Sequence, residues 1–135
     1  PDSRSGRKAE RRTRPESYTV QTDSGLEIRP ELFDGEAREE AARCQLVSDT
    51  QMRRFFGAAK AEQMGMQSGN QARVAMALLK AKAHYAAARD KKNRELADLF
   101  GHHARLIRTK DDFGHFMRHF EAVIAYHKFN QQVRR

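Results

Sequence analysis

The stretch NQARVAMALLKAKAHYAAAR, residues 70–89, decides the predicted fold because its apolar residues lie on two opposite sides of one helix. At about 100° per residue, the first stripe holds Val74, Leu78, Ala81, Tyr85 and Ala88. The second stripe holds Ala72, Met76, Leu79, Ala83 and Ala86. A helix with two apolar faces is central or is shared with a neighbour. We therefore predict that it packs its own domain on one side and meets protein on the other, with Met76, Leu79 and Ala83 in the subunit interface.

Helical periodicity continues through most of the remaining chain. Apolar residues repeat at helical spacing over residues 36–46, 49–64, 95–108 and 110–130. Ser48 with Gln51, and Thr109 with Asp112, have the spacing of N-terminal helix caps. No stretch is typical of a strand, apart from a brief extended piece at residues 18–20. The sequence therefore predicts an all-α fold, a compact bundle of about five helices.

The N-terminal residues differ in composition from the rest. Residues 1–24 hold almost no apolar side chains and a block of Arg and Lys. Such a segment buries too little surface to offset the entropy lost on ordering. We predict a disordered basic and polar tail over residues 1–30 and a single helical-bundle domain over residues 31–135. The whole chain of 135 residues is long enough to form a core without disulfides or metals.

The net charge of +8 is spread unevenly along the chain. Residues 1–14 carry six Lys and Arg against two acids, residues 15–47 carry three against eight, and residues 48–135 carry seventeen against eight. The helical part is therefore the basic part. A compact basic domain favours a polyanionic partner, nucleic acid first, because neutralised phosphates release counterions. The alternative is that the charge serves only solubility.

Patterns that carry catalytic or metal chemistry are scarce. The chain has no GxSxG motif, no glycine-rich phosphate loop and no HExxH motif. His115 and His119 stand four residues apart, a spacing at which two imidazoles share zinc, but the sequence indicates no further ligands. His103 and His127 fall within apolar arcs and are predicted to be core histidines bonded to backbone carbonyls. We therefore predict no catalytic residue, no metal and no cofactor.

The cysteine count and the hydropathy pattern bound the location. The lone Cys44 cannot form an internal disulfide, which favours a reducing compartment. No run of about 18 apolar residues is present, so we expect no membrane-spanning segment. The predicted location is the cytoplasm.

Three pairs of cations lie seven residues apart on the predicted helices. They are Arg53 with Lys60, Arg73 with Lys80, and Lys82 with Arg89. Seven residues span about 10 Å along a helix, so each pair has the reach to bridge phosphates of one strand. Solvated helix faces explain the same spacing. Tyr85, Tyr126 and His84 carry rings that stack on bases, although packing explains their presence as well.

Three segments resemble one protein family. They are SDTQMRRFF at residues 48–56, LLKAKAHYAAAR at residues 78–89 and FGHFMRHFEAVIAYHK at residues 113–128. In order and spacing they resemble the small helical subunit of type III-A CRISPR effector (Csm) complexes, over about residues 46–128. The last segment is the most specific, because amphipathicity alone does not produce a Phe-rich approach to FEAVIAYHK.

The resemblance implies a non-catalytic subunit of an antiviral CRISPR-Cas ribonucleoprotein. Several copies would stack along the guide RNA–target RNA duplex, beside the backbone RNase subunits and with the large polymerase-like subunit in the same complex. The family's basic residues match Arg53, Arg54, Lys80, Lys82, Arg89 and Lys128. Together with Lys60 from the basic rows, these are the predicted RNA-binding residues. Ala88 departs from the family's pattern, in which glycine is common before the Arg.

Two other functions compete with this interpretation. A free-standing basic helical DNA-binding regulator would need base-reading side chains near the N-terminus of a recognition helix. Gln71 and Arg73 offer a faint match. A His-dependent metalloenzyme is the third hypothesis. Co-purification with a processed small RNA and several other proteins would favour the CRISPR subunit.

Overall fold

The computed structural model of the chain describes residues 14–133. Most of this part consists of α2 (Gly35–Arg43), α3 (Asp49–Gln63), α4 (Gly69–Arg89), α5 (Arg94–Ala104) and α6 (Lys110–Val133). Two short 3-10 helices, η1 (Pro30–Phe33) and η2 (Lys91–Asn93), precede α2 and α5. The predicted all-α bundle of about five helices is therefore confirmed. None of the described helices combines the length and the apolar character needed to cross a membrane.

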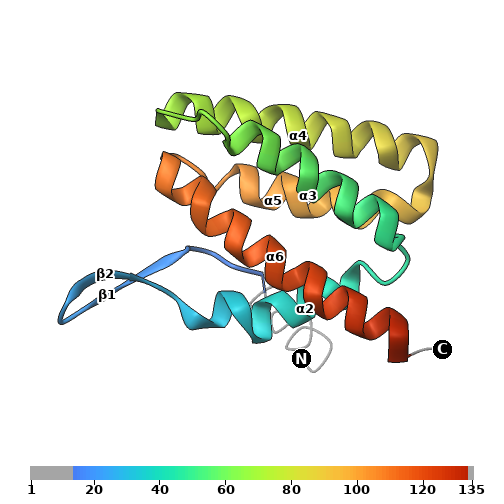
Figure 1. Cartoon of the computed structure of the whole chain (residues 1–135), viewed down its shortest axis with the longest axis horizontal. Coiled ribbons are helices and arrows are strands. Elements are labelled where there is room, and N and C mark those ends of the chain that lie inside the picture. The colour runs from blue at the N-terminus through green and yellow to red at the C-terminus, as the bar shows by residue number, and fades with distance from the viewer. Residues whose placement is uncertain (1–13, 134–135) are drawn as a thin grey trace, which may run out of the picture.

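The helix at the centre of the bundle is α6, not α4. It packs against α2, α3, α4 and η1 and crosses the middle of the molecule in Figure 1. Its buried face carries large side chains, among them Phe113, Phe116 and Phe120. The ring centroids of Phe116 and Phe120 lie 5.7 and 5.6 Å from that of Phe100 on α5. Stacked and edge-on aromatic rings from α5 and α6 thus fill the core.

Side-chain caps fix where the helices begin. The Ser48 hydroxyl accepts a hydrogen bond from the backbone N–H of Gln51 at 3.1 Å. The Thr109 hydroxyl accepts one from the backbone N–H of Asp112 at 3.0 Å, and the Asp112 carboxylate accepts the Thr109 N–H at 3.1 Å. Both predicted caps are confirmed. Ser68 caps α4 in the same way, at a position that the sequence did not single out.

The two apolar stripes of α4 have different surroundings. The buried stripe consists of Ala72, Ala75, Met76, Leu79 and Ala83, and it packs mainly on α5. Val74 and Leu78, on the other stripe, are 51% and 50% exposed. The prediction that Met76, Leu79 and Ala83 form a subunit interface is therefore wrong, because these residues lie in the chain's own core. The stripe that another protein can reach is the one that contains Val74 and Leu78.

Residues 14–30 hold structure where the sequence predicts a disordered tail. Strand β1 (Thr19–Thr22) pairs antiparallel with β2 (Gly25–Ile28), and Gly25 turns the chain with a φ of 107°, which favours glycine. Tyr18 is 3% exposed and belongs to the core. The prediction of disorder is therefore wrong for residues 14–30. Its remaining part, residues 1–13, lies outside the described residues.

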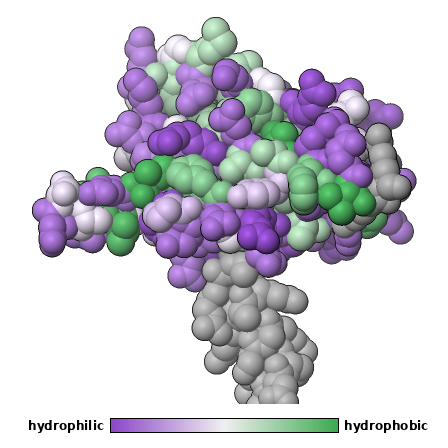
Figure 2. All heavy atoms as spheres, turned by 60° about the horizontal axis from the view of Figure 1, so that its bottom comes forward, coloured by the Kyte–Doolittle hydropathy of each residue, from purple (hydrophilic) through white to green (hydrophobic). Residues whose placement is uncertain are grey.

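The hairpin of β1 and β2 projects from the helical body (Figure 1). Figure 2 shows hydrophobic residues where the hairpin joins the body and hydrophilic residues at its tip. Arg29 fixes its base, because one guanidinium N–H donates to the Ser17 carbonyl oxygen at 2.6 Å and another to the Glu36 carboxylate at 2.5 Å. The hairpin is thus tied to the start of α2.

Candidate functional site

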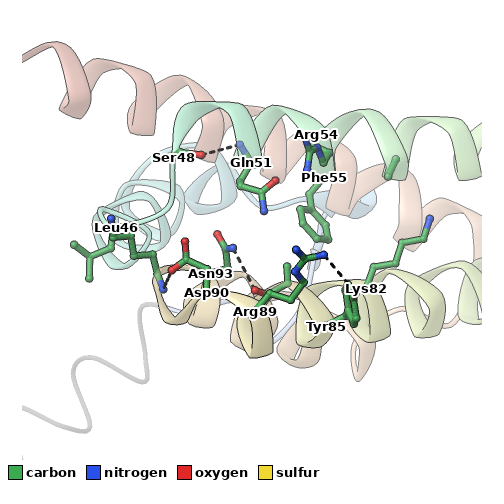
Figure 3. A pocket seen from close by; sticks show the side chains of 13 residues that line it. Leu46, Ser48, Gln51, Arg54, Phe55, Lys82, Tyr85, Arg89, Asp90 and Asn93 are labelled. Atoms are coloured by element: carbon green, nitrogen blue, oxygen red, sulfur yellow. Dashed lines mark hydrogen bonds between the residues drawn. The ribbon is translucent and has the colours of Figure 1, made fainter.

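A hollow of about 810 Å³ lies between the first half of α3 and the second half of α4. In Figure 3, Gln51 and Phe55 extend from α3 toward side chains that rise from α4, and Arg54 of α3 also lines the hollow. Asn93 of η2 stands at one end. The remaining lining residues are Leu46, Ser48, Ala58, Lys82, Tyr85, Ala86, Arg89, Asp90 and Lys92. The hollow therefore joins two helices that are separated by a loop in the sequence.

Four exposed cations surround this hollow: Arg54, Lys82, Arg89 and Lys92. Among residues 14–133, none of the four forms an ion pair with a carboxylate. Asp90 is the one acid among the described residues that line the hollow. The hollow is therefore a local excess of positive charge, which attracts phosphate groups.

An aromatic side chain stands beside these cations. Tyr85 is 65% exposed, although a ring of its size gains free energy from burial. The Arg89 guanidinium lies 5.8 Å from the centre of the Tyr85 ring, and its Nη1 donates to the Tyr85 hydroxyl at 3.5 Å. The pair offers two adjoining planar groups, and planar groups of this kind stack on nucleic-acid bases.

The other predicted RNA-binding residues lie outside the hollow. Arg53 and Lys128 both pair with Asp49, at 3.6 and 3.5 Å. Lys60 lies over the Phe56 ring, 5.8 Å from its centre. These cations are separate from the hollow, and two of them are partly neutralised.

Lys80 lines a smaller hollow on the other side of α4, together with Arg73. The row of Arg73 and Lys80 thus keeps the arrangement predicted from its spacing. Of the seven predicted residues, the structure brings together Arg54, Lys82 and Arg89. Arg54 lies off the row of Arg53 and Lys60, yet it is the α3 cation that lines the hollow.

Sequence reasoning missed three members of the hollow. Lys92 and Asn93 lie in the polar break after α4, and Gln51 was assigned only to the start of α3. Helical spacing cannot relate these residues to Lys82, because they belong to different elements. The one available signal was the basic pair Lys91 and Lys92 directly after the basic end of α4.

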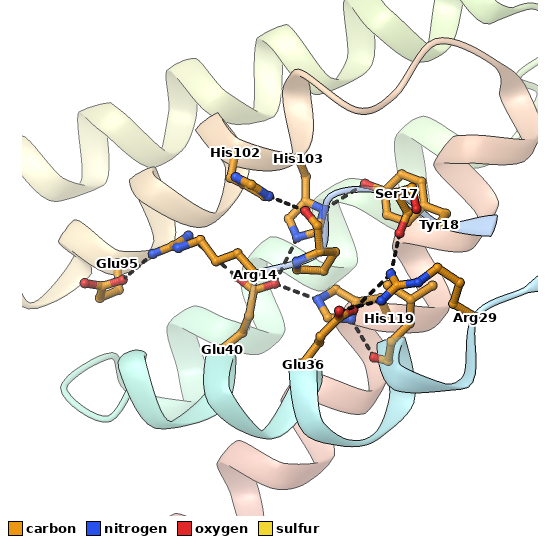
Figure 4. Close-up of polar contacts among 12 residues, drawn as sticks. Arg14, Ser17, Tyr18, Arg29, Glu36, Glu40, Glu95, His102, His103 and His119 are labelled. Carbon is orange, nitrogen blue, oxygen red and sulfur yellow. Dashed lines mark hydrogen bonds and ion pairs between the residues drawn. The ribbon is translucent and has the colours of Figure 1, made fainter. Parts of the chain in front are cut away.

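Apart from the hollow, a cluster of polar side chains lies buried in the core (Figure 4). Glu40 of α2 is 1% exposed, and its Oε2 lies 2.9 Å from Nε2 of His103 and 2.6 Å from Nε2 of His119. Nδ1 of His103 contacts the Tyr18 hydroxyl at 2.7 Å, and Nδ1 of His119 contacts the Leu32 carbonyl oxygen at 2.6 Å. The group links the N-terminal segment to α2, α5 and α6.

The hydrogen bonds define the protons of this group. A carbonyl oxygen only accepts, so Nδ1 of His119 donates to Leu32, and its Nε2 donates to the ionised Glu40. His119 is therefore an imidazolium. His103 donates to Glu40 from Nε2 and accepts the Tyr18 hydroxyl proton at Nδ1, so it is neutral.

Burial and charge act in opposite directions on these groups. Burial disfavours ionisation of Glu40, but the two imidazoles that donate to it hold the pKa of Glu40 well below its usual range. Burial lowers the pKa of His103 to about 4, although Glu40 acts to raise it. Arg14 adds a further positive charge, 3.7 Å from Oε1 of Glu40. The result is a buried ion pair with every imidazole nitrogen hydrogen-bonded.

The same three side chains form a possible metal-ligand set. One ligand atom from each of Glu40, His103 and His119 lies within 4.8 Å of the others. Their types suit zinc, but each atom already has a hydrogen-bond partner. A divalent ion there would also place excess positive charge in the core next to Arg14, which is costly. We assign the group to stability. His115, the other histidine of the predicted pair, is not part of it.

The remaining predicted core histidine behaves as expected. Nε2 of His127 lies 2.8 Å from the Val47 carbonyl oxygen, and the residue is fully buried. His103 is also buried, but its partners are side chains and not the predicted backbone carbonyl.

Comparison with protein families gives one finding. The family model Csm2 Type III-A matches residues 27–132, a range that begins in β2 and ends one residue before the end of α6. Comparisons with curated proteins and with solved structures give no match. The family match extends over most of the chain and agrees with the segments that carry the resemblance. The chain therefore belongs to the Csm2 type III-A family, and is the small subunit of a type III-A CRISPR-Cas complex.

Proposed function

We propose that this chain is a non-catalytic subunit that stacks in several copies along the guide RNA–target RNA duplex and contacts RNA through the hollow between α3 and α4. It acts in antiviral defence in the cytoplasm, with the backbone RNase subunits and the large polymerase-like subunit as its partners. The observation that carries the RNA contact is the set of four cations around the hollow, which have no carboxylate partner in the described structure.

The cations of the hollow differ from the paired ones in what a phosphate must displace. A phosphate that approaches Arg53 or Lys128 competes with Asp49, which already neutralises part of their charge. A phosphate that approaches Lys82 or Arg89 displaces only water and counterions. Counterion release then makes binding favourable and strongly dependent on salt. The hollow is therefore the preferred place for a nucleotide backbone.

The exposed stripe of α4 supports the stacking part of the proposal. Val74 and Leu78 are both about half exposed, and they belong to one helix face. In a repeating assembly, each copy of the chain has another copy beside it that can cover this exposed stripe. Burial of such side chains contributes about 25 cal/mol per Å² of apolar surface. A small stripe therefore gives weak association, which other contacts in the complex would strengthen.

The RNA contact is tested with charge-matched variants. Lys82→Ala combined with Arg89→Ala removes two unpaired cations from the hollow. Arg38→Ala combined with Arg53→Ala removes two exposed cations that pair with acids four residues earlier, Asp34 and Asp49. Both double variants change the net charge equally. Fluorescence anisotropy with single-stranded RNA at several salt concentrations then gives the affinity and its salt dependence.

We expect the hollow variant to reduce the slope of log K against log salt by about 1.4, since each lost phosphate contact on a single strand removes about 0.7. The slope of the control variant should differ from the wild-type slope by less than about 0.7. Equal slopes for the hollow variant and the wild type would contradict the proposal. Tighter binding to one DNA sequence than to RNA would instead support the free-standing DNA-binding regulator.

A further inference from the structure

We propose that the hollow between α3 and α4 holds one unpaired RNA base, with the adjoining phosphates on the surrounding cations. This inference rests on the proposed RNA contact and adds the part of the nucleotide that is recognised. Four features of the hollow support it: the apolar wall, the amide groups, the exposed ring and the distribution of charge.

Much of the wall of the hollow is apolar, although phosphate binding needs only charged and polar groups. Leu46, Phe55, Ala58 and Ala86 form much of its lining, and Phe55 extends into it from α3 (Figure 3). A phosphate backbone gains nothing from such a surface, whereas the faces of a base do. The volume of about 810 Å³ lies in the range of pockets for small organic ligands, about 300–1,000 Å³.

Two amides supply polar groups that suit the edge of a base. Gln51 and Asn93 come from different elements and face each other across the hollow in Figure 3. The Asn93 amide N–H donates to the Ala86 carbonyl oxygen at 3.4 Å, which leaves its own oxygen toward the open space. Within the described residues, Oε1 of Gln51 is buried without a hydrogen-bond partner. Its terminal torsion is soft, so a small rotation presents this amide to a ligand.

Tyr85 and Arg89 complete the site at the entrance. The Tyr85 ring is 65% exposed and is held by the Arg89 guanidinium. A ring that is open to solvent forms a stacking surface for a base. Base–aromatic stacking of this kind tolerates any base.

The charges give the site a direction. Figure 3 shows Asp90 near Asn93 at one end and Arg54 with Lys82 at the other. Asp90 and Lys92 offset each other's charge at one end, whereas Arg54 and Lys82 add positive charge at the other, so the backbone should lie toward Arg54 and Lys82. The base then points toward Asn93 and Gln51. Asp90 also has acceptor oxygens for a sugar hydroxyl or an exocyclic amino group.

The test uses the full chain and two RNA duplexes that differ by a single bulged nucleotide. The variants are Tyr85→Ala, at the hollow, and Met64→Ala as the control, an exposed residue directly after α3 and outside the hollow. We expect the wild type to bind the bulged duplex about 5- to 150-fold more tightly than the perfect duplex, the range that stacking of one base gives. Tyr85→Ala should abolish this preference. Met64→Ala should retain it.

The outcomes separate this inference from the proposed function. Salt-dependent binding of both duplexes without any preference would overturn the base pocket and leave the RNA contact standing. A preference that persists in Tyr85→Ala and also in the second variant Gln51→Leu would overturn the pocket as well. Failure of the wild type to bind either duplex would overturn both proposals.

Discussion

Replacement of Glu40 by alanine should destabilise the protein severely, because this residue neutralises a buried charge. The Glu40 carboxylate is 1% exposed and accepts hydrogen bonds from His103 at 2.9 Å and His119 at 2.6 Å. Glu40→Ala leaves the His119 imidazolium buried without its counterion. Breaking a buried pair in this way costs about 3–5 kcal/mol. Since domains of this size have a free energy of unfolding of about 5–15 kcal/mol, the variant should be marginally folded.

Glu40→Gln should cost much less, and it is the matched control. The glutamine NH₂ group can donate to Nε2 of both histidines, each of which then carries its proton on Nδ1 and donates to Leu32 or Tyr18. Both imidazoles are then neutral, no imidazole nitrogen is left without a partner, and Arg14 keeps its ion pair with Glu95. We expect a loss of about 0.5–1.5 kcal/mol, typical of a changed hydrogen bond.

The same group predicts how stability depends on pH. The pKa of His103 falls from about 6.5 in the unfolded chain to about 4 in the folded one, so the unfolded chain binds more protons between these values. Stability should therefore fall as the pH decreases from about 6.5 to about 4. The pKa of Glu40 is also lowered by folding, so its contribution is present above about pH 4.3 and is lost as the pH falls further.

Urea unfolding followed by far-ultraviolet circular dichroism measures these effects, at about pH 7.5 and about pH 5. A Glu40→Ala variant within about 1 kcal/mol of the wild type, with an unchanged m-value, would refute the buried ion pair. Equal losses for the Gln and Ala variants would refute the proton assignment, because the neutral arrangement would then be unable to form.

Two further predictions concern α4. Gly69→Ala should lower the free energy of unfolding by about 1–3 kcal/mol, because the new Cβ would meet the Arg108 carbonyl oxygen at the start of α6. The control Gly57→Ala has open space around its Cβ in α3 and should stabilise by about 0.5–1 kcal/mol, and thermal unfolding of the two variants compares them directly. Leu78→Asp should leave the stability of the isolated chain within about 0.5 kcal/mol of the wild type, since Leu78 is half exposed. It should weaken self-association measured by sedimentation velocity, and unchanged association would remove the exposed stripe from the proposed stacking contact.

Local sequence signals were sufficient to find the helices. The spacing of Phe113, Phe116 and Phe120 defines one face of α6, and Ser48 and Thr109 mark helix starts through hydrogen bonds within four residues. Such features depend on neighbours along the chain. They are therefore visible without any knowledge of the tertiary structure.

The face that α4 buries could not be predicted in this way. Both stripes are apolar, and the pair Val74 and Leu78 on the exposed stripe is at least as hydrophobic as the pair Met76 and Leu79 on the buried one. The choice depends on α5, because alanines on the buried stripe allow the two helices to approach closely. The hairpin was missed for a similar reason. Tyr18 is held by His103, 85 residues later in the chain, and no local pattern records that contact.

The hollow shows the same limit for the candidate site. Lys82 and Arg89 share a row that spacing reveals, but Arg54 and Lys92 reach the hollow only because α3 and η2 pack beside α4. Family resemblance indicated Arg54 and gave no indication of Lys92. When a site is formed by side chains from several elements, the sequence thus predicts only some of its residues.

The arrangement of residues on α4 also relates its two proposed contacts to each other. At about 100° per residue, Val74, Leu78, Lys82, Tyr85 and Arg89 all fall within about 80° of one another. The exposed apolar residues occupy the first half of this face, and the RNA-facing residues occupy the second half. A neighbouring subunit that covers Leu78 would therefore lie directly beside RNA in the hollow. RNA that spans several subunits should then favour their stacking, and stacking should raise the affinity for long RNA by bringing successive hollows onto one strand. Leu78→Asp should consequently weaken binding to long RNA more than binding to an oligonucleotide that fills a single hollow.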